Sequence, residues 1–196
     1  MYNYMSHLPI IVLPPSMRFS KDISLRQACR AIDVTDADDI ILAQSAIGEM
    51  FKTLYSDPSG VALAAPQVGI QLRITVISYD DRDSDQYRLL ALVNPEIIES
   101  SEEQEDDREI CLSIPNFDGK VTRAKKIKVK AFDQHGKPND FEAEGFFATV
   151  IQHEVDHLNG ILYIDRLKGE LQVIPDYPER RLEPTLKKLG IKKKKK

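Results

Sequence analysis

Residues 152–157 read Gln152-His153-Glu154-Val155-Asp156-His157 and contain the pattern H-E-x-x-H. They lie near the end of a stretch, residues 144–158, whose apolar residues recur at helical spacing and which Asn159-Gly160 would terminate. Two histidines four residues apart project from one face of a helix, where their imidazoles can hold a divalent metal. Glu154 beside them could act as a general base. The stretch therefore predicts a metal-binding helix.

A catalytic metal site needs a third protein ligand and one open position. The other two histidines of the chain are His7 and His135. Cys111 is the remaining soft ligand, and its thiolate would bind Zn²⁺ or Fe²⁺ strongly. Glu170 or Glu179 would be the third ligand of a zincin-like endopeptidase. The residues alone thus leave a thiolate and a carboxylate as alternatives.

The rest of the chain predicts one α+β domain. Residues 36–54 have the apolar spacing of a helix, with Asp36 as its N-terminal cap. Four stretches predict strands: residues 72–78, 89–93, 126–132 and 141–144. Three stretches predict irregular segments: an extended arm at 1–30, a turn at Asn94-Pro95 and a solvated acidic loop at 99–108. We expect mixed or antiparallel strands packed around the central metal-binding helix, with a catalytic domain at 1–170 and a peripheral tail at 171–196.

Charge is divided unevenly along the 196 residues. The net charge is −4, from 27 Lys and Arg against 31 Asp and Glu, but residues 187–196 hold seven lysines and no acid. The remaining 186 residues therefore hold 20 bases against 31 acids. An acidic body argues against a protein that reads duplex DNA. The lysine-rich tail has the composition of a disordered, solubilising end.

Several other classes are excluded by simple features of the sequence. Its apolar runs are far shorter than the roughly 20 residues that cross a membrane as a helix. The first basic residue is Arg18, so the N-terminus does not resemble a secretory signal. Two cysteines are too few for a disulfide framework, and we expect Cys29 to be a small buried apolar residue. We expect a cytoplasmic monomer that binds neither DNA nor a membrane.

Three segments resemble the peptide deformylase family, metallohydrolases that remove the formyl group from the initiator methionine of nascent chains. Residues 60–67 read GVALAAPQ against G-x-G-x-A-A-P-Q, and residues 109–113 read EICLS against E-G-C-L-S. Residues 152–160 match Q-H-E-x-D-H-L-x-G. The resemblance covers about residues 35–167, and the three segments together are strongly specific.

The resemblance implies a role for each residue of the site. Cys111, His153 and His157 would bind the metal, Fe²⁺ in the cell with Zn²⁺ or Ni²⁺ able to replace it. Glu154 would take a proton from the water bound to that metal and deliver it to the leaving amine. The Gln67 amide and the Leu112 backbone N–H would bind the oxygen of the tetrahedral intermediate. The substrate cleft would be lined by six residues: Val61, Ala62, Ile110, Phe146, Thr149 and Val150. Glu109 and Arg123 would form a supporting ion pair.

Two family glycines are replaced, by Ala62 and by Ile110. Ile110 is the larger departure, because a β-branched side chain disfavours positive φ. It predicts a reshaped substrate cleft around an intact metal site. The same departure motivates a second possibility, a catalytically weakened homologue that binds peptides or ribosomes. The resemblance implies N-formylmethionyl nascent peptides as the substrate, and the lysine tail could add transient contact with ribosomal RNA.

Overall fold

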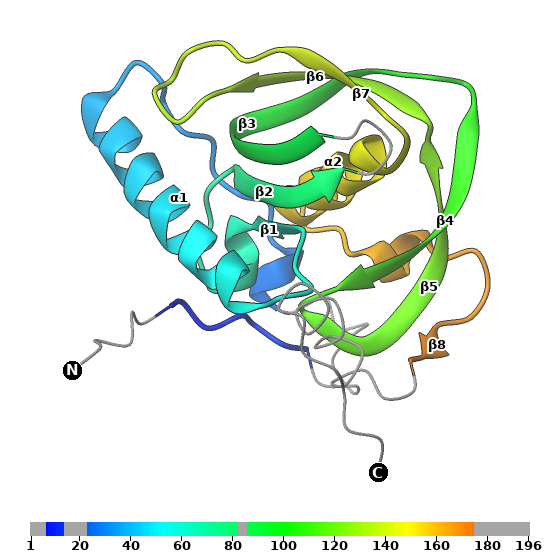
Figure 1. Ribbon diagram of the computed structural model, residues 1–196. Coiled ribbons are helices and arrows are strands. Elements are labelled where there is room, and N and C mark those ends of the chain that lie inside the picture. Colours follow the sequence, from blue (N-terminus) through cyan, green and yellow to red (C-terminus); the bar gives the residue numbers. More distant parts are fainter. Residues whose placement is uncertain (1–6, 14–22, 82–85, 175–196) are drawn as a thin grey trace.

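A computed structural model describes residues 7–13, 23–81 and 86–174. In this part of the chain the predicted α+β fold is confirmed, with antiparallel strands and two α-helices (Figure 1). The helices are α1 (Ala37–Ser56) and α2 (Gly145–Leu158). The strands are β1 (Ala62–Ala64), β2 (Ile74–Asp81), β3 (Gln86–Ser100), β4 (Gln104–Cys111), β5 (Ile114–Ala124), β6 (Lys126–Phe132), β7 (Phe141–Glu144) and β8 (Gln172–Val173). Within the described ranges, three short 3₁₀ helices cover Ser24–Arg26, Ala65–Val68 and Tyr163–Arg166.

The strands form two antiparallel sheets. One has the order β1-β2-β3-β6-β7, and the other has the order β4-β5-β8. Helix α2 contacts strands of both sheets, while α1 covers β1 and β2. Strands β1 and β4 are each at the edge of their sheet. The central position of the helix that carries H-E-x-x-H, as the sequence predicted, therefore places its side chains between two sheet edges.

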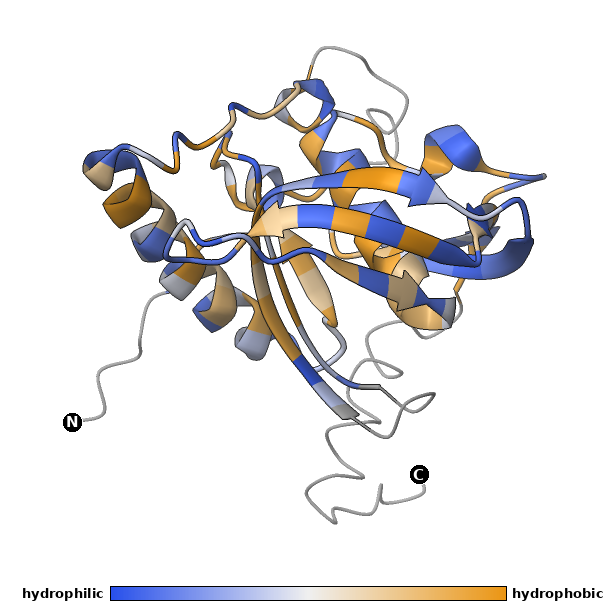
Figure 2. Cartoon of the chain, turned by 90° about the horizontal axis from the view of Figure 1, so that it is seen from above, coloured by the Kyte–Doolittle hydropathy of each residue, from blue (hydrophilic) through white to orange (hydrophobic). Residues whose placement is uncertain are grey.

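The two helices bury separate apolar clusters against the larger sheet. Banding along the strands in Figure 2 shows apolar and polar residues alternating, as expected where one face is buried. Under α1 the cluster includes Ile47, Met50 and Val76, and under α2 it includes Ile77 and Ile151. Val76 and Ile77 are neighbours in β2 and point to opposite faces. The larger sheet is thus covered on both faces in the region of β2.

Local signals determine where the helices begin and end. The Asp36 carboxylate accepts a hydrogen bond from the Asp38 backbone N–H, which confirms the predicted cap of α1. Helix α2 ends at Leu158 with Asn159 as its C-cap, and Gly160 follows with a φ of 73°. A Cβ on Gly160 would lie 2.4 Å from the Arg26 carbonyl oxygen, so only glycine fits this position.

The predicted turn at Asn94-Pro95 is wrong. Both residues lie inside β3, where the pairing with β6 shifts register between Val93 and Glu96. Asn94 has a φ of 51°, and its side-chain amide bonds both the N–H and the carbonyl of Ile32. Asn94 and Pro95 therefore mark a bulge within one long strand, and Ile32, just after the arm, supplies the hydrogen bonds at that point.

The predicted acidic loop at 99–108 is also wrong. Residues 104–108 belong to β4, which pairs along its length with β5, and residues 99–100 are the end of β3. The side chains of this stretch are solvated as expected, but opposite charges on β5 pair with some of them: Lys120 lies 2.7 Å from Asp106, and Arg108 donates to Asp118 at 3.0 Å. Opposite charges across an antiparallel pair support a strand that charge composition alone disfavours.

The arm and the tail are only partly described. In the described part of the arm, Ile11 donates its N–H to the Gln67 carbonyl and Leu13 donates to the Ser113 carbonyl, so the arm runs along the body. Residues 172–173 pair with β5, while the lysine-rich segment lies outside the described residues. The boundary at residue 170 stays a prediction. Among the described helices, none has both the length and the apolar character needed to cross a membrane.

Candidate active site

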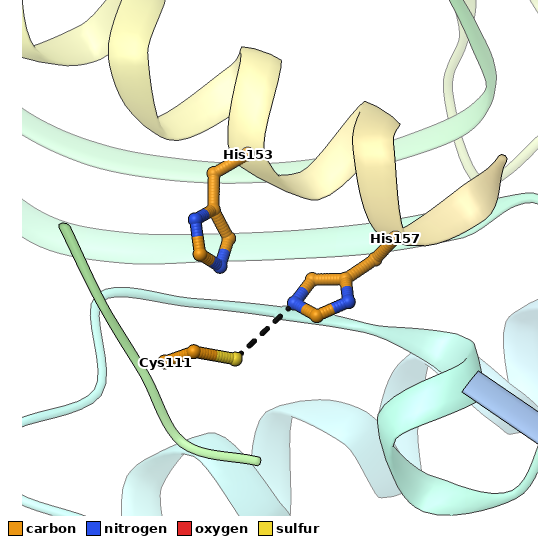
Figure 3. A group of neighbouring side chains, drawn as sticks. All are labelled: Cys111, His153 and His157. Atoms are coloured by element: carbon orange, nitrogen blue, oxygen red, sulfur yellow. Dashed lines mark hydrogen bonds between the residues drawn. The ribbon is translucent and has the colours of Figure 1, made fainter. Parts of the chain in front are cut away.

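Helix α2 and strand β4 bring three metal-binding side chains together. His153 and His157 project from one face of α2 toward Cys111, the last residue of β4 (Figure 3). One donor atom from each residue lies within 4.8 Å of the others, and the Cys111 Sγ is 3.3 Å from the His157 Nε2. Glu170 is exposed and is not a member of this cluster. Among the described residues, the third donor beside the two histidines is therefore a thiol.

The donor set fits a single divalent ion. In a tetrahedral site with bonds of about 2.0–2.3 Å, the donor atoms lie about 3.3–3.8 Å apart. The cluster is close to this size already, and all three side chains are buried. Among the described residues, the buried Nδ1 of His157 has no hydrogen-bond partner, and the Nδ1 of His153 is taken by Glu109. One thiolate with two imidazoles suits Fe²⁺, Zn²⁺ and Ni²⁺ alike.

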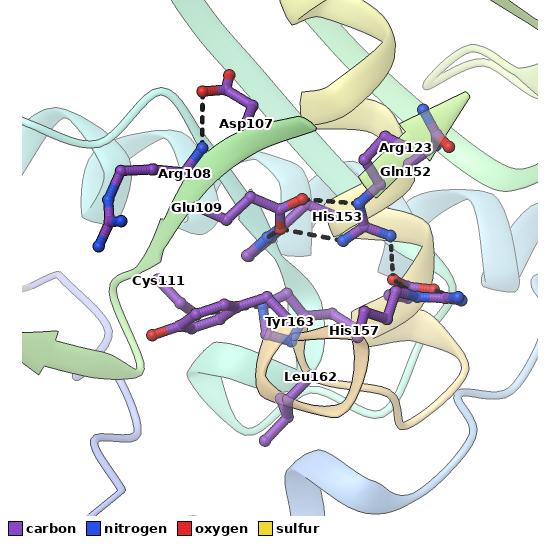
Figure 4. A network of polar contacts seen from close by, with 12 residues as sticks. Asp107, Arg108, Glu109, Cys111, Arg123, Gln152, His153, His157, Leu162 and Tyr163 are labelled. Atoms are coloured by element: carbon purple, nitrogen blue, oxygen red, sulfur yellow. Dashed lines mark hydrogen bonds and ion pairs between the residues drawn. The ribbon is translucent and has the colours of Figure 1, made fainter. Parts of the chain in front are cut away.

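A buried ion-pair network holds His153 in place (Figure 4). The Glu109 carboxylate lies 2.7 Å from the His153 Nδ1 and accepts two hydrogen bonds from Arg123, at 2.7 and 3.0 Å. Arg123 also donates to Asp156 at 2.5 Å, and Asp156 accepts two further bonds from Arg166. Burial alone would raise the pKa of Glu109. Its hydrogen bonds and ion pairs with His153 and Arg123 outweigh this effect and lower the pKa to about 2. The carboxylate therefore stays charged and orients the ring.

The ion pair expected between Glu109 and Arg123 is thus present, and it extends further than the sequence suggested. Asp156 is a buried partner of two arginines and does not belong to the three-residue cluster. Gln152, which the sequence left without a role, bonds both the N–H and the carbonyl of Ala124. Side chains on one helix thereby tie α2 to the β5 strand.

Removing the arginine from this network is expected to destabilise the protein strongly. Arg123→Met leaves Glu109 and Asp156 buried without their shared cation, so the free energy of unfolding should fall by about 3–5 kcal/mol. Lys128→Met is a matched control, because Lys128 and Glu99 form a solvated pair at 3.2 Å and should contribute less than about 1 kcal/mol. Urea unfolding of both variants at equal metal content measures the difference. Equal losses would contradict the structural importance of the buried network.

Glu154 lies on the cavity side of α2. Its side chain is buried, and the Thr75 hydroxyl is 3.5 Å from its Oε2. Burial raises the pKa of Glu154 to about 7. A carboxylate with a pKa near the working pH is suited to both taking and returning a proton. Thr75 also donates to the Leu63 carbonyl at 3.1 Å, which anchors it in β2.

The Gln67 amide is aimed at the same cluster. It lies on the 3₁₀ helix that follows β1, and its Oε1 accepts the Ala64 backbone N–H at 2.8 Å. That bond fixes the amide so that its Nε2 points to the Ser113 Oγ at 3.3 Å and to the Cys111 Sγ at 3.5 Å. Leu112 follows Cys111 directly and lines the same cavity. The segments that directly follow β1 and β4 therefore bring Gln67 and Leu112 near the three ligands.

A cavity of about 270 Å³ opens beside the cluster. All six residues expected to line the substrate border it: Val61, Ala62, Ile110, Phe146, Thr149 and Val150. Phe146 is 40% exposed and packs edge-on against Tyr79, with ring centroids 5.4 Å apart. Gln67, Cys111, His153 and Glu154 border it as well. The cavity is mostly apolar apart from this polar end, which suits a ligand with an apolar side chain and one reacting group.

The two replaced glycines cause no backbone strain. Among the described residues, only Asn94 and Asn116 combine a side chain with a positive φ, so Ala62 and Ile110 both have ordinary backbones. Ala62 is buried in β1, while Ile110 is 47% exposed in β4. The side chain of Ile110 therefore borders the cavity from outside and does not fill the metal site.

Several contributors to the site carried no signal in the sequence. Thr75 and Ser113 contact Glu154 and Gln67 from β2 and from the turn before β5. Tyr163 stacks against His153 with ring centroids 6.1 Å apart, and its hydroxyl donates to the Phe117 carbonyl. Asp107 and Arg108 border the cavity mouth. A pattern of spacing cannot reveal such residues, because each comes from a different segment.

Fold and site together define an α+β protein whose buried Cys-His-His cluster can hold one divalent metal at the end of an apolar cavity. The family model described as polypeptide deformylase matches residues 17–172. A peptide deformylase of Lachnoclostridium phytofermentans is 40% identical over 169 residues, covering 86% of this chain and 98% of the relative. Peptide deformylase 1 of Clostridium perfringens is 46% identical over 150 residues, covering 76% and 95%.

Solved structures agree with these relatives. The peptide deformylase of Thermotoga maritima is 36% identical with a TM-score of 0.69, covering 84% of this chain and 99% of that chain. A Met-Ala-Ser-bound peptide deformylase of Acinetobacter baumannii is 32% identical with the same TM-score, covering 83% and 99%. The chain belongs to the peptide deformylase family and is an enzyme of that family.

Proposed function

We propose that the enzyme removes the N-formyl group from the initiator methionine of newly synthesised polypeptides. The observation that carries this proposal is the cluster of Cys111, His153 and His157 with the buried Glu154 beside it, at the polar end of an apolar cavity. A zincin-like endopeptidase with Glu170 as a ligand receives no support from this arrangement, since Glu170 lies outside the cluster; the other candidate, Glu179, lies outside the described residues.

Each residue of the site has one part in the hydrolysis. A bound divalent metal would polarise the formyl carbonyl and lower the pKa of a water molecule that it binds. Glu154 takes a proton from the attacking water and gives it to the amine nitrogen as the C–N bond breaks, so formate and a free amino terminus result. The Gln67 Nε2 and the Leu112 backbone N–H donate to the carbonyl oxygen as its negative charge develops. Glu109 acts through His153 by holding its ring.

Sheet edges on either side of the cavity suit an extended peptide. Residues Val61 and Ala62 approach from the β1 side, and Ile110 and Cys111 approach from the β4 side. A peptide in this position can add as a strand through its main chain, while side chains enter pockets alternately. The methionine side chain then reaches the apolar end bordered by Thr149 and Val150. The Acinetobacter baumannii relative with bound Met-Ala-Ser supports such a ligand.

The proposal includes the setting in which the enzyme works. Nascent chains that carry N-formylmethionine are the partner, and the cytoplasm is the compartment. We propose Fe²⁺ as the native metal, one ion per chain, with Zn²⁺ or Ni²⁺ as replacements. Affinity alone would favour Ni²⁺ and Zn²⁺ over Fe²⁺, so metal supply decides which ion is bound. The monomeric state stays a prediction.

A direct assay tests the reaction. The purified enzyme is loaded with Fe²⁺ or Ni²⁺ without oxygen, and formate release from formyl-Met-Ala-Ser is measured. Turnover that depends on the bound metal is the expected result. A protein that holds one metal per chain yet releases no formate would overturn the proposal and favour the alternative of a weakened peptide- or ribosome-binding homologue.

The lysine-rich end is expected to be dispensable for chemistry. Deleting residues 191–196 should leave kcat/KM on short formylated peptides within about twofold, because every catalytic candidate precedes residue 158. Co-sedimentation with ribosomes at low and high salt then separates two interpretations of the tail. Binding that falls on deletion and weakens with salt supports contact with ribosomal RNA. Unchanged co-sedimentation supports a solubilising end.

A further inference from the structure

Two large apolar side chains among the described residues are exposed and border the cavity: Phe146, which packs against Tyr79, and Ile110. Ile110 borders the cavity, yet 47% of its surface is exposed. Its neighbours Glu109 and Cys111 are only 6% and 3% exposed. Exposed apolar side chains are common singly, but one at the entrance to a substrate cavity adds apolar surface where a ligand must pass.

Alternation along β4 sets the direction of this side chain. Successive residues of a strand point to opposite faces, so Ile110 points away from the side on which Glu109 meets His153 and Cys111 meets His157. Its cross-strand partner is Asp118, which also lies on the solvated side. Ile110 therefore cannot touch the methionine side chain at the buried end of the cavity.

An extended peptide beside β4 follows the same alternation. If its first side chain points inward to the cavity, its second points outward, onto the face where Ile110 lies. The charged side chains beside Ile110 on that face, Asp118 and Arg108, are paired with each other, and Arg108 also donates to Gln172 at 2.8 Å. The second side chain of the peptide thus meets an apolar surface flanked by a guanidinium that is already paired.

We propose that Ile110 determines specificity for the residue that follows N-formylmethionine, favouring bulky apolar side chains over glycine. This inference rests on the proposed deformylation. Contact with Ile110 removes apolar surface of both partners from water, which is favourable in proportion to the area buried. A closed apolar pocket discriminates by about 10-fold or more in kcat/KM for each methylene group. Because the contact with Ile110 stays partly solvated, we expect a smaller preference, of roughly fivefold in kcat/KM.

The test compares formyl-Met-Leu-Ser with formyl-Met-Gly-Ser in the metal-loaded enzyme. The ratio of their kcat/KM values should be roughly five in the wild type and fall to about one in Ile110→Gly. Ile110→Ala, which keeps a Cβ and the strand backbone, should give an intermediate ratio. Ile98→Ala is the matched control, because Ile98 is an isoleucine of β3 that is 44% exposed and does not border the cavity.

A second readout does not depend on turnover. Inhibition constants of the products Met-Leu-Ser and Met-Gly-Ser should differ in the same direction and converge in Ile110→Gly. A wild type that processes both formylated peptides equally would overturn the role of Ile110 while leaving deformylation intact. A ratio that survives in both Ile110 variants, with circular dichroism unchanged, would overturn it as well. Absence of turnover on every formylated peptide would instead overturn the proposed function and this inference with it.

Discussion

Cys111→Ala is expected to empty the metal site and abolish deformylation. Two imidazoles from one helix would remain, without the thiolate that closes the set on the β4 side. Removing even an outer partner of a ligand typically weakens metal binding by about 10–100-fold, so loss of a ligand should exceed about 100-fold. Metal per chain after dialysis, measured by elemental analysis, gives the result together with formate release.

The second cysteine provides the matched control. Cys29 is buried beside Ala64 and Leu158, and its Sγ is 3.6 Å from the Gln71 amide oxygen. Burial raises the pKa of the Cys29 thiol to about 11, so it stays neutral and apolar, which agrees with its expected structural role. Cys29→Ala should keep one metal per chain. Full metal retention in Cys111→Ala would refute the thiolate ligand and reopen the search for a carboxylate ligand.

Glu154→Gln should lower kcat by about 10²–10⁴-fold while the protein keeps its metal. The amide has nearly the same shape as the carboxylate, so it can still contact Thr75, but it cannot take a proton from water. A loss in kcat with little change in KM is the pattern expected when a group acts in the transition state alone. Formate release measured over a range of peptide concentrations separates the two parameters.

Glu142→Gln controls for the same chemical change elsewhere. Glu142 is an exposed carboxylate of β7, the strand that directly precedes the helix carrying Glu154. Its replacement should change kcat less than about twofold. If Glu154→Gln turned over within tenfold of the wild type, another group would have to move the proton.

Both predictions depend on residues that the sequence could identify, but for different reasons. His153, Glu154 and His157 belong to one helix, so a local repeat of 3.6 residues per turn is enough to place them together. Cys111 lies 46 positions from His157, and spacing alone left it in competition with two glutamates. Among the features of the sequence, the resemblance of three segments to a known family is what favoured the cysteine.

The two wrong predictions about local structure share a cause. Asn94-Pro95 has the composition of a turn, and the acidic stretch has the composition of a loop. Both predictions depended only on residues that are adjacent along the chain. In the fold, Ile32 supplies the hydrogen bonds that Asn94 needs, and β5 supplies opposite charges that pair with those of β4. Strand pairing between distant segments is decided by tertiary contacts, which override local composition.

The sequence by itself determined the metal-binding helix and its C-terminal end, the Asp36 cap of α1 and the uneven charge, since each depends on residues that are close along the chain. The tertiary structure decided what surrounds that helix. It joined Glu109, Arg123 and Asp156 into one buried network, brought Thr75 to Glu154, and turned Ile110 outward at the cavity. These contacts join separate strands and a helix, so their geometry follows from how the two sheets pack on α2 and not from any local spacing.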